Sequence, residues 1–219
     1  MRGKLVAGYR LVFGLLTLGT FVLYLVDRLG GADFSVANYL SYFTIQSNVI
    51  GGIVLVWGAG GLLRGRDETR GFSSLRGAAA TYLITTGVVT QTLLADVDPA
   101  QLNTPGYVDV IMHQILPVVM LLDWLIAAPA NRLGPKDAAT WLIYPLVYAA
   151  YTLIRGPIVD WYPYPFIDPR ERGYGYVAVM CGIVTVWFVA LAAALAWGGN
   201  SLRDRARPSG RPVSTSPGR

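Results

Sequence analysis

The sequence has few cysteine, histidine and charged residues, and each of these shortages excludes certain kinds of bond or binding site. Its 219 residues include one cysteine, one histidine and only 14% charged residues. The single cysteine, Cys181, rules out an intrachain disulfide and a cysteine-based metal cluster, and its position in an apolar run favours a packing role. The single histidine rules out paired histidine ligands for a metal. We therefore expect neither a metal nor a cofactor.

Several motifs of soluble enzymes are missing as well. There is no Gly-x-Ser-x-Gly nucleophile motif, no phosphate-binding loop and no Gly-x-Gly-x-x-Gly fingerprint. The net charge of +5 would suggest nucleic acid binding in a soluble protein, but here the basic residues lie in short segments between apolar runs. In that position they orient a membrane protein, so we expect no nucleic acid partner.

What the sequence has in abundance is apolar residues, at 53%. They form six runs near the length of about 20 residues that a helix needs to cross a bilayer. The runs cover residues 5–26, 36–63, 75–95, 107–128, 138–154 and 174–197. They show no period-two alternation, which excludes a membrane barrel. The first run is long for a signal peptide, and we expect it to be retained. The sequence therefore predicts an all-α integral membrane bundle of six transmembrane helices.

The distribution of basic residues predicts how this bundle is oriented. If the N-terminus is cytoplasmic, fourteen of the eighteen Lys and Arg residues lie inside. The other four, Arg28, Arg155, Arg170 and Arg172, lie outside. The positive-inside bias then makes both termini cytoplasmic. Arg10, near the start of the first run, is expected to snorkel to the interface. Residues 1–199 would form the membrane domain, and the Arg-, Ser- and Pro-rich segment 200–219 a disordered cytoplasmic tail.

A polar stretch in the second run is the first candidate for a functional site. Ser41, Thr44, Ser47 and Asn48 follow spacings of three and four, which places them on one helix face. At 1.5 Å per residue, Thr44 lies roughly 10 Å below the outer end of its helix, and His113 roughly 9 Å below the outer end of the fourth. The topology therefore predicts that both side chains share one depth, toward the outer leaflet.

His113 is the only histidine that could activate Thr44. Asp109 precedes His113 by one helical turn, so its carboxylate could hold one ring nitrogen and leave the other as a base. A base beside the Thr44 hydroxyl would make it a nucleophile toward an ester. Each residue also has a structural alternative. His113 could join two helices by a hydrogen bond, Asp109 could face water, and Thr44 could bond to its own helix.

A third polar strip follows the fifth run. Tyr144, Tyr148, Tyr151 and Arg155 recur at spacings of four, three and four, which again makes one face. The Arg155 guanidinium could bind the carboxylate of a fatty-acid substrate, with Tyr151 beside it. The alternative is an ion pair between Arg155 and Asp160 or Asp168 in the next loop.

Three further polar residues lie within the runs. Asn48 and Gln91 are candidate donors to an oxyanion, and helix packing explains Gln91 equally well. Asp123 lies ten residues after His113, in the cytoplasmic half. It could accept an interior hydrogen bond or belong to a proton path.

Three short segments of the sequence resemble those of a known protein family. They are Phe43-Thr44, Met112-His113 and the segment Trp161-Tyr162-Pro163-Tyr164-Pro165-Phe166. In this order they resemble the six-pass proteins related to androgen-induced protein and the androgen-dependent regulator of tissue factor pathway inhibitor, which include bacterial relatives. The resemblance covers the chain from about residue 6 to residue 197 and leaves out the C-terminal segment.

The resemblance implies a membrane-embedded threonine hydrolase that cleaves fatty acid esters of hydroxy fatty acids. It assigns the nucleophile to Thr44 and the histidine partner to His113, with a lipid ester as substrate and the bacterial cytoplasmic membrane as location. The oligomeric state stays open. Gln46, Ser47 and Asn48 make the surroundings of Thr44 more polar than in animal members. Two alternatives are a carrier or binding protein for a small amphipathic ligand and a structural scaffold.

Overall fold

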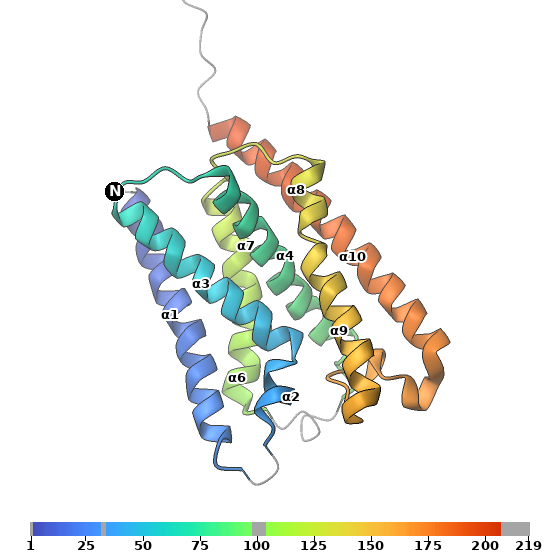
Figure 1. Cartoon of the computed structure of the whole chain (residues 1–219). Coiled ribbons are helices and arrows are strands. Elements are labelled where there is room, and N and C mark those ends of the chain that lie inside the picture. The colour runs from blue at the N-terminus through green and yellow to red at the C-terminus, as the bar shows by residue number, and fades with distance from the viewer. Residues whose placement is uncertain (1, 32–33, 98–103, 207–219) are drawn as a thin grey trace, which may run out of the picture.

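The chain folds as a bundle of long helices. The computed structural model describes residues 2–31, 34–97 and 104–206 (Figure 1). Within these ranges every regular element is a helix and no strand occurs. The prediction of an all-α protein is therefore confirmed for the described part of the chain.

The helices follow the predicted apolar runs closely. Their bounds are α1 Arg2–Arg28, α2 Val36–Leu40, α3 Phe43–Leu63, α4 Arg70–Thr92, α6 Gly106–Val110, the π-helix η1 Ile111–Ile115, α7 Leu116–Ile126, α8 Pro135–Thr140, α9 Ile143–Val159, the 3₁₀ helix η2 Pro165–Ile167, and α10 Pro169–Ala206. The last helix continues through residues 200–206 of the predicted tail. The remainder of that tail, 207–219, lies outside the described residues.

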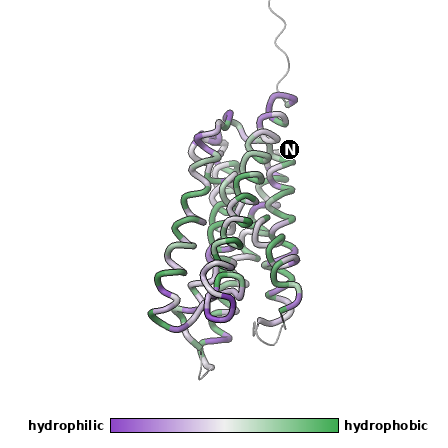
Figure 2. The backbone as a smooth tube through the Cα atoms, turned by 90° about the vertical axis from the view of Figure 1, so that its right-hand side faces the viewer, coloured by the Kyte–Doolittle hydropathy of each residue, from purple (hydrophilic) through white to green (hydrophobic). Residues whose placement is uncertain are grey.

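Five helical segments are long and apolar enough to cross a membrane. They are Gly3–Arg28, Phe43–Leu63, Gly106–Ile126, Pro135–Val159 and Pro169–Ala206. Figure 2 shows hydrophobic residues along most of their length and hydrophilic residues concentrated toward the ends of the bundle. These are the features of an integral membrane protein.

The third predicted run forms α4, which is long but is not among the five. Figure 1 shows α4 inside the bundle, with α3 and α7 on one side and α10 on the other. Twelve of its residues are buried, and they include Ser73, Arg76 and Thr81. A helix enclosed by other helices needs little apolar surface toward lipid, so polar and small residues are tolerated there.

Two predicted helices are interrupted. The second run breaks between α2 and α3, where Tyr42 adopts extended backbone angles (φ −76°, ψ 129°) and acts as the N-cap of α3. The fifth run breaks between α8 and α9 at Trp141 and Leu142. The first break matters for the site, because it places Thr44 in the first turn of a new helix rather than in the interior of a continuous one.

The fourth run contains a π-helical segment around His113. Pro117 lacks the N–H that would bond to the carbonyl of His113 in a regular α-helix. The wider turn of η1 appears directly before it. Gly87 of α4 permits the close packing here, since a Cβ at that position would lie 2.9 Å from the Pro117 ring. Short π segments commonly occur at functional sites.

The segment 160–168 between α9 and α10 is an ordered cap. Arg170 binds both carboxylates of this segment, with its guanidinium 2.9 Å from Asp160 and 2.6 Å from Asp168. The hydrogen bonds from Arg170 lower the pKa of Asp168 below its ordinary value. The Tyr162 ring packs on Gly156, where any larger residue would collide with it. This cap positions Tyr164 next to the N-terminus of α3.

A buried ionic cluster ties the other half of the bundle together. Asp123 accepts from Arg10 at 2.6 Å and from Arg76 at 2.9 Å, and all three side chains are almost fully buried. Glu68 completes the cluster at 3.2 Å from Arg76. The expectation that Arg10 snorkels to the interface is wrong, because a buried carboxylate holds it inside. The interior hydrogen bond expected for Asp123 is confirmed.

Candidate active site

Thr44, His113 and Asp109 form a continuous hydrogen-bonded chain. Thr44 Oγ1 lies 3.2 Å from His113 Nε2, and His113 Nδ1 lies 2.7 Å from Asp109 Oδ1. Since an ionised carboxylate only accepts, it fixes the proton on Nδ1 and leaves Nε2 as the acceptor for the threonine hydroxyl. The structure brings Thr44 and His113, predicted to share one depth, into contact, and it confirms the predicted proximity of Asp109 and His113.

The elements account for this geometry. Thr44 stands in the first turn of α3, and Asp109 stands in α6, one turn before His113 in η1. Asn48 links the two helices, because its Nδ2 donates to the Thr44 carbonyl at 2.8 Å and to the Met112 carbonyl at 3.4 Å. Asn48 is fully buried and acts on the backbone beside the pair, not on the hydroxyl.

Two tyrosine hydroxyls cap the start of α3. The N–H of Phe43 donates to the Tyr148 hydroxyl at 3.2 Å, and the N–H of Thr44 donates to the Tyr164 hydroxyl at 3.1 Å. These two N–H groups have no partner within the helix, so the hydroxyls satisfy them. Tyr164 also lies 3.3 Å from Thr44 Oγ1. Burial raises the pKa of Tyr164, which keeps its O–H intact as a donor.

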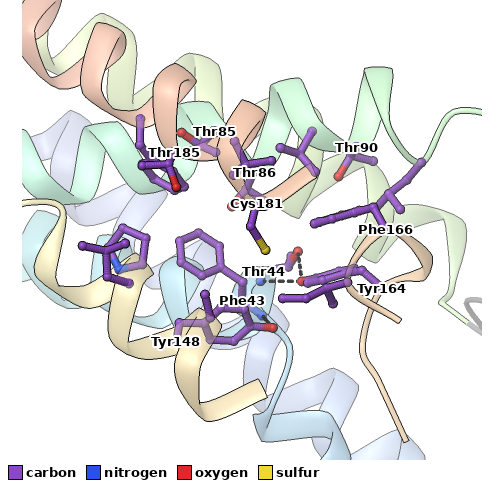
Figure 3. A pocket seen from close by; sticks show the side chains of 18 of the residues that line it. Phe43, Thr44, Thr85, Thr86, Thr90, Tyr148, Tyr164, Phe166, Cys181 and Thr185 are labelled. Atoms are coloured by element: carbon purple, nitrogen blue, oxygen red, sulfur yellow. Dashed lines mark hydrogen bonds between the residues drawn. The ribbon is translucent and has the colours of Figure 1, made fainter. Parts of the chain in front are cut away.

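Two cavities meet at Thr44. The first, here called the apolar cavity, lies among α3, α4, α9, α10 and the cap (Figure 3). The second, the His113 cavity, lies among α1, α2, α3, α4, α6 and η1. Four residues line both cavities: Thr44, Thr90, Leu94 and Tyr164. His113 and Asp109 line the His113 cavity only.

The lining of the apolar cavity consists mostly of apolar side chains. Two of its threonines are hydrogen-bonded to other groups, since Thr86 donates to the Tyr82 carbonyl at 3.0 Å and Thr85 accepts from Trp187 at 3.1 Å. The Cys181 side chain points into the cavity from α10 (Figure 3). The cavity is thus suited to an apolar group next to the Thr44 hydroxyl.

The remaining predicted site residues do not contact Thr44. Gln91 is exposed and lines neither cavity. Tyr151 shares a 2.8 Å hydrogen bond with Ser41. Arg155 donates to Asn38 at 2.6 Å and stacks over Trp161.

The expected ion pairs of Arg155 are not the ones observed. Asp160 and Asp168 pair with Arg170 instead. Arg155 and Tyr151 therefore join α9 to α2 at the outer end of the bundle.

Tyr164 is the site residue that spacing along helices did not identify. It comes from a loop, where periodicity gives no direction for a side chain, and the only signal was its place in the aromatic and proline-rich segment 161–166. Among the described residues, no group of three or more His, Cys, Asp or Glu side chains could hold a metal ion. Comparisons with protein-family models, curated proteins and solved structures gave no match.

Proposed function

We propose that this protein is a membrane-embedded hydrolase of lipid esters with Thr44 as nucleophile. The observation that carries the proposal is the chain from Thr44 Oγ1 through His113 to Asp109, at 3.2 and 2.7 Å. A hydroxyl, a base in contact with it and a carboxylate that orients the base form the arrangement that activates a nucleophile. The resemblance of Phe43-Thr44, Met112-His113 and the segment 161–166 to the androgen-induced protein family points to the same chemistry.

In the proposed reaction, His113 Nε2 takes the proton from Thr44 as the hydroxyl oxygen attacks the ester carbonyl. The bond from the carbonyl carbon to the alcohol oxygen then breaks, and the proton on His113 passes to that oxygen. The alcohol leaves, and an acyl group remains on Thr44. A water molecule, deprotonated by His113, attacks the acyl group and releases the fatty acid with a free Thr44 hydroxyl.

Tyr164 is the donor we propose for the oxyanion. Its hydroxyl lies 3.3 Å from the attacking oxygen and accepts the Thr44 N–H at 3.1 Å. That N–H belongs to the first turn of α3, and the positive end of the helix dipole polarises the tyrosine O–H. A neutral, buried donor already aligned beside the nucleophile is what oxyanion stabilisation requires.

We further propose six membrane crossings with both termini cytoplasmic. The five apolar spans together with the enclosed α4 make six passes, and the excess of Lys and Arg between them gives the orientation. The site then opens toward the outer leaflet, which in a bacterium would be that of the cytoplasmic membrane.

A fluorophosphonate probe tests the proposal directly. The full-length protein, purified and reconstituted into lipid bilayers, is expected to be labelled at Thr44. Mass spectrometry of the peptide that carries the adduct identifies the labelled residue. Thr44→Ala and His113→Ala should both abolish labelling and ester turnover. Thr44→Ser, which keeps a hydroxyl, is the matched control and should be labelled at the new serine. Undiminished labelling and turnover in both alanine variants would refute the proposal.

The two cavities also favour a second function, that of a carrier for an amphipathic ligand. Such a protein would bind a fatty acid saturably and would not hydrolyse any ester. Turnover that depends on Thr44 distinguishes the hydrolase from this carrier.

A further inference from the structure

We infer that the two cavities divide the substrate, with the acyl chain in the apolar cavity and the alcohol in the His113 cavity. This inference rests on the proposed function and adds the direction in which the ester binds. It depends on one feature of the geometry, which is that Thr44 and Tyr164 line both cavities whereas His113 lines only one.

The position of the base decides where the alcohol lies. His113 must pass its proton to the oxygen of the departing alcohol, so that oxygen has to lie within hydrogen-bond reach of Nε2. His113 lines the second cavity together with Tyr24, Tyr39 and Asp109. The alcohol therefore leaves through the His113 cavity, and the water that releases the acyl group must follow by the same route.

The acyl chain must then lie on the side of Thr44 that faces away from His113. After the alcohol departs, the acyl group is bonded to Thr44 Oγ1 and must point away from the base so that water can approach. The apolar cavity begins at Thr44 on the side that His113 does not line. The carbonyl oxygen then falls at the junction of the cavities, where the Tyr164 hydroxyl lies 3.3 Å from Thr44 Oγ1.

The lining of the two cavities suits this division. Val89, Leu94 and Phe188 line the apolar cavity, and the hydroxyls of Thr85 and Thr86 are engaged outside it. An alkyl chain has no polar group that needs a hydrogen-bond partner, so it can be buried among these apolar side chains without losing a hydrogen bond. The His113 cavity contains the Asp109 carboxylate, 36% exposed, which favours a neutral or polar alcohol over one that carries a second carboxylate nearby.

The apolar cavity also reaches the outside of the bundle. Leu146 of α9 lines it and is 54% exposed. Cys181 and Val184 of α10 line the cavity and are half-buried. A lipid chain can therefore enter from the bilayer between α9 and α10 without crossing water.

Two isomeric esters test the direction of binding. Ethyl dodecanoate has a long acyl chain and a short alcohol, and dodecyl acetate has the reverse, while their composition is identical. Wild-type protein in diether lipid bilayers is expected to hydrolyse ethyl dodecanoate faster. Cys181→Trp, which fills the apolar cavity, should lower turnover of ethyl dodecanoate at least about tenfold and leave that of dodecyl acetate within about twofold. Equal loss of both, or selective loss of dodecyl acetate, would overturn the inference.

A second measurement needs neither catalysis nor a folded tryptophan variant. Cys181 is the single cysteine, so N-ethylmaleimide reports on the wall of the apolar cavity alone. In Thr44→Ala protein, dodecanoic acid should slow the alkylation of Cys181, and an unchanged rate would contradict the acyl site. Protection without ester turnover in the wild type would refute the hydrolase and retain the chain site. Turnover without protection would refute the inference alone.

Discussion

At the scale of single residues, the Thr44 hydroxyl is contacted from two other segments of the chain. His113 from η1 and Tyr164 from the cap converge on one oxygen at 3.2 and 3.3 Å, and Asp109 stands behind the histidine. Helical rise predicted that Thr44 and His113 share one depth, and the spacing of four residues predicted that Asp109 can reach His113. That Thr44 and His113 face each other is a finding of the structure. Tyr164 could not be predicted in this way, because its direction is set by the packing of a loop.

The hydroxyl of Tyr164 is expected to be essential to the rate and not to substrate binding. Tyr164→Phe keeps the ring, which stacks on Phe166 and packs on Tyr42, and removes only the donor. Loss of one oxyanion donor should lower kcat about 100-fold with KM little changed. Steady-state kinetics on ethyl dodecanoate would measure both quantities.

Tyr162→Phe provides the matched control in the same segment. Tyr162 lines neither cavity and packs its ring on Gly156 at the cap. Its variant should retain the wild-type kcat. A Tyr164→Phe protein with unchanged kcat, or with a raised KM alone, would mean that the hydroxyl serves only to cap α3.

At the scale of elements, two irregularities in the helices place Thr44 and His113 in the candidate site. The break at Tyr42 places Thr44 in the first turn of α3, where the tyrosine hydroxyls cap the helix, and His113 lies in the π-helix η1. The hydrophobic runs predicted where helices lie, because burial and lipid exposure both select apolar residues. They did not predict the break, since Ser41 and Tyr42 carry no glycine or proline signal and the tyrosine hydroxyls that satisfy the new helix end come from distant segments.

Pro117→Ala tests whether the π-helix orients the histidine. Alanine restores the missing N–H, so the chain can return to a regular α-helix and the side chain of His113 would rotate relative to α3. A displacement near 1 Å is enough to cost about 100-fold in rate, and we expect labelling of Thr44 by the fluorophosphonate to slow by that factor. The rate of adduct formation is the measurement, and circular dichroism checks that helix content is retained.

The control for this substitution is Pro157→Ala. Pro157 is also a proline inside a helix, in α9, but it lines neither cavity. Its removal should leave the labelling rate at the wild-type value. Equal rates in Pro117→Ala and wild type would show that η1 is not needed for the geometry of the site.

At the scale of the whole molecule, the candidate site and the buried ionic cluster lie in different parts of the bundle. The site lies at the end of the bundle with α2, α6 and the cap, whereas the Arg10–Asp123–Arg76 cluster joins α1, α4 and α7 further along their length (Figure 1). The sequence indicated a buried position for Asp123 but did not indicate one for Arg10. A basic residue that snorkels to the interface and one that is buried both occur as a single charge in an apolar run. The two positions are distinguished only by whether a carboxylate on another helix lies close enough to pair with the arginine.

Asp123 is therefore expected to matter for folding and not for chemistry. Asp123→Asn leaves two guanidinium groups that are 2% and 1% exposed with only Glu68 to pair with, and breaking a buried pair typically costs about 3–5 kcal/mol. The thermal unfolding midpoint in detergent should fall sharply, while protein that remains folded should be labelled at Thr44 at the wild-type rate. In Arg10→Met/Asp123→Asn, the unpaired cation at position 10 is gone, so the loss should be smaller than the sum of the two single losses. Additive losses would show that Arg10 and Asp123 do not act as a pair, and slower labelling of folded Asp123→Asn would favour a proton path through Asp123.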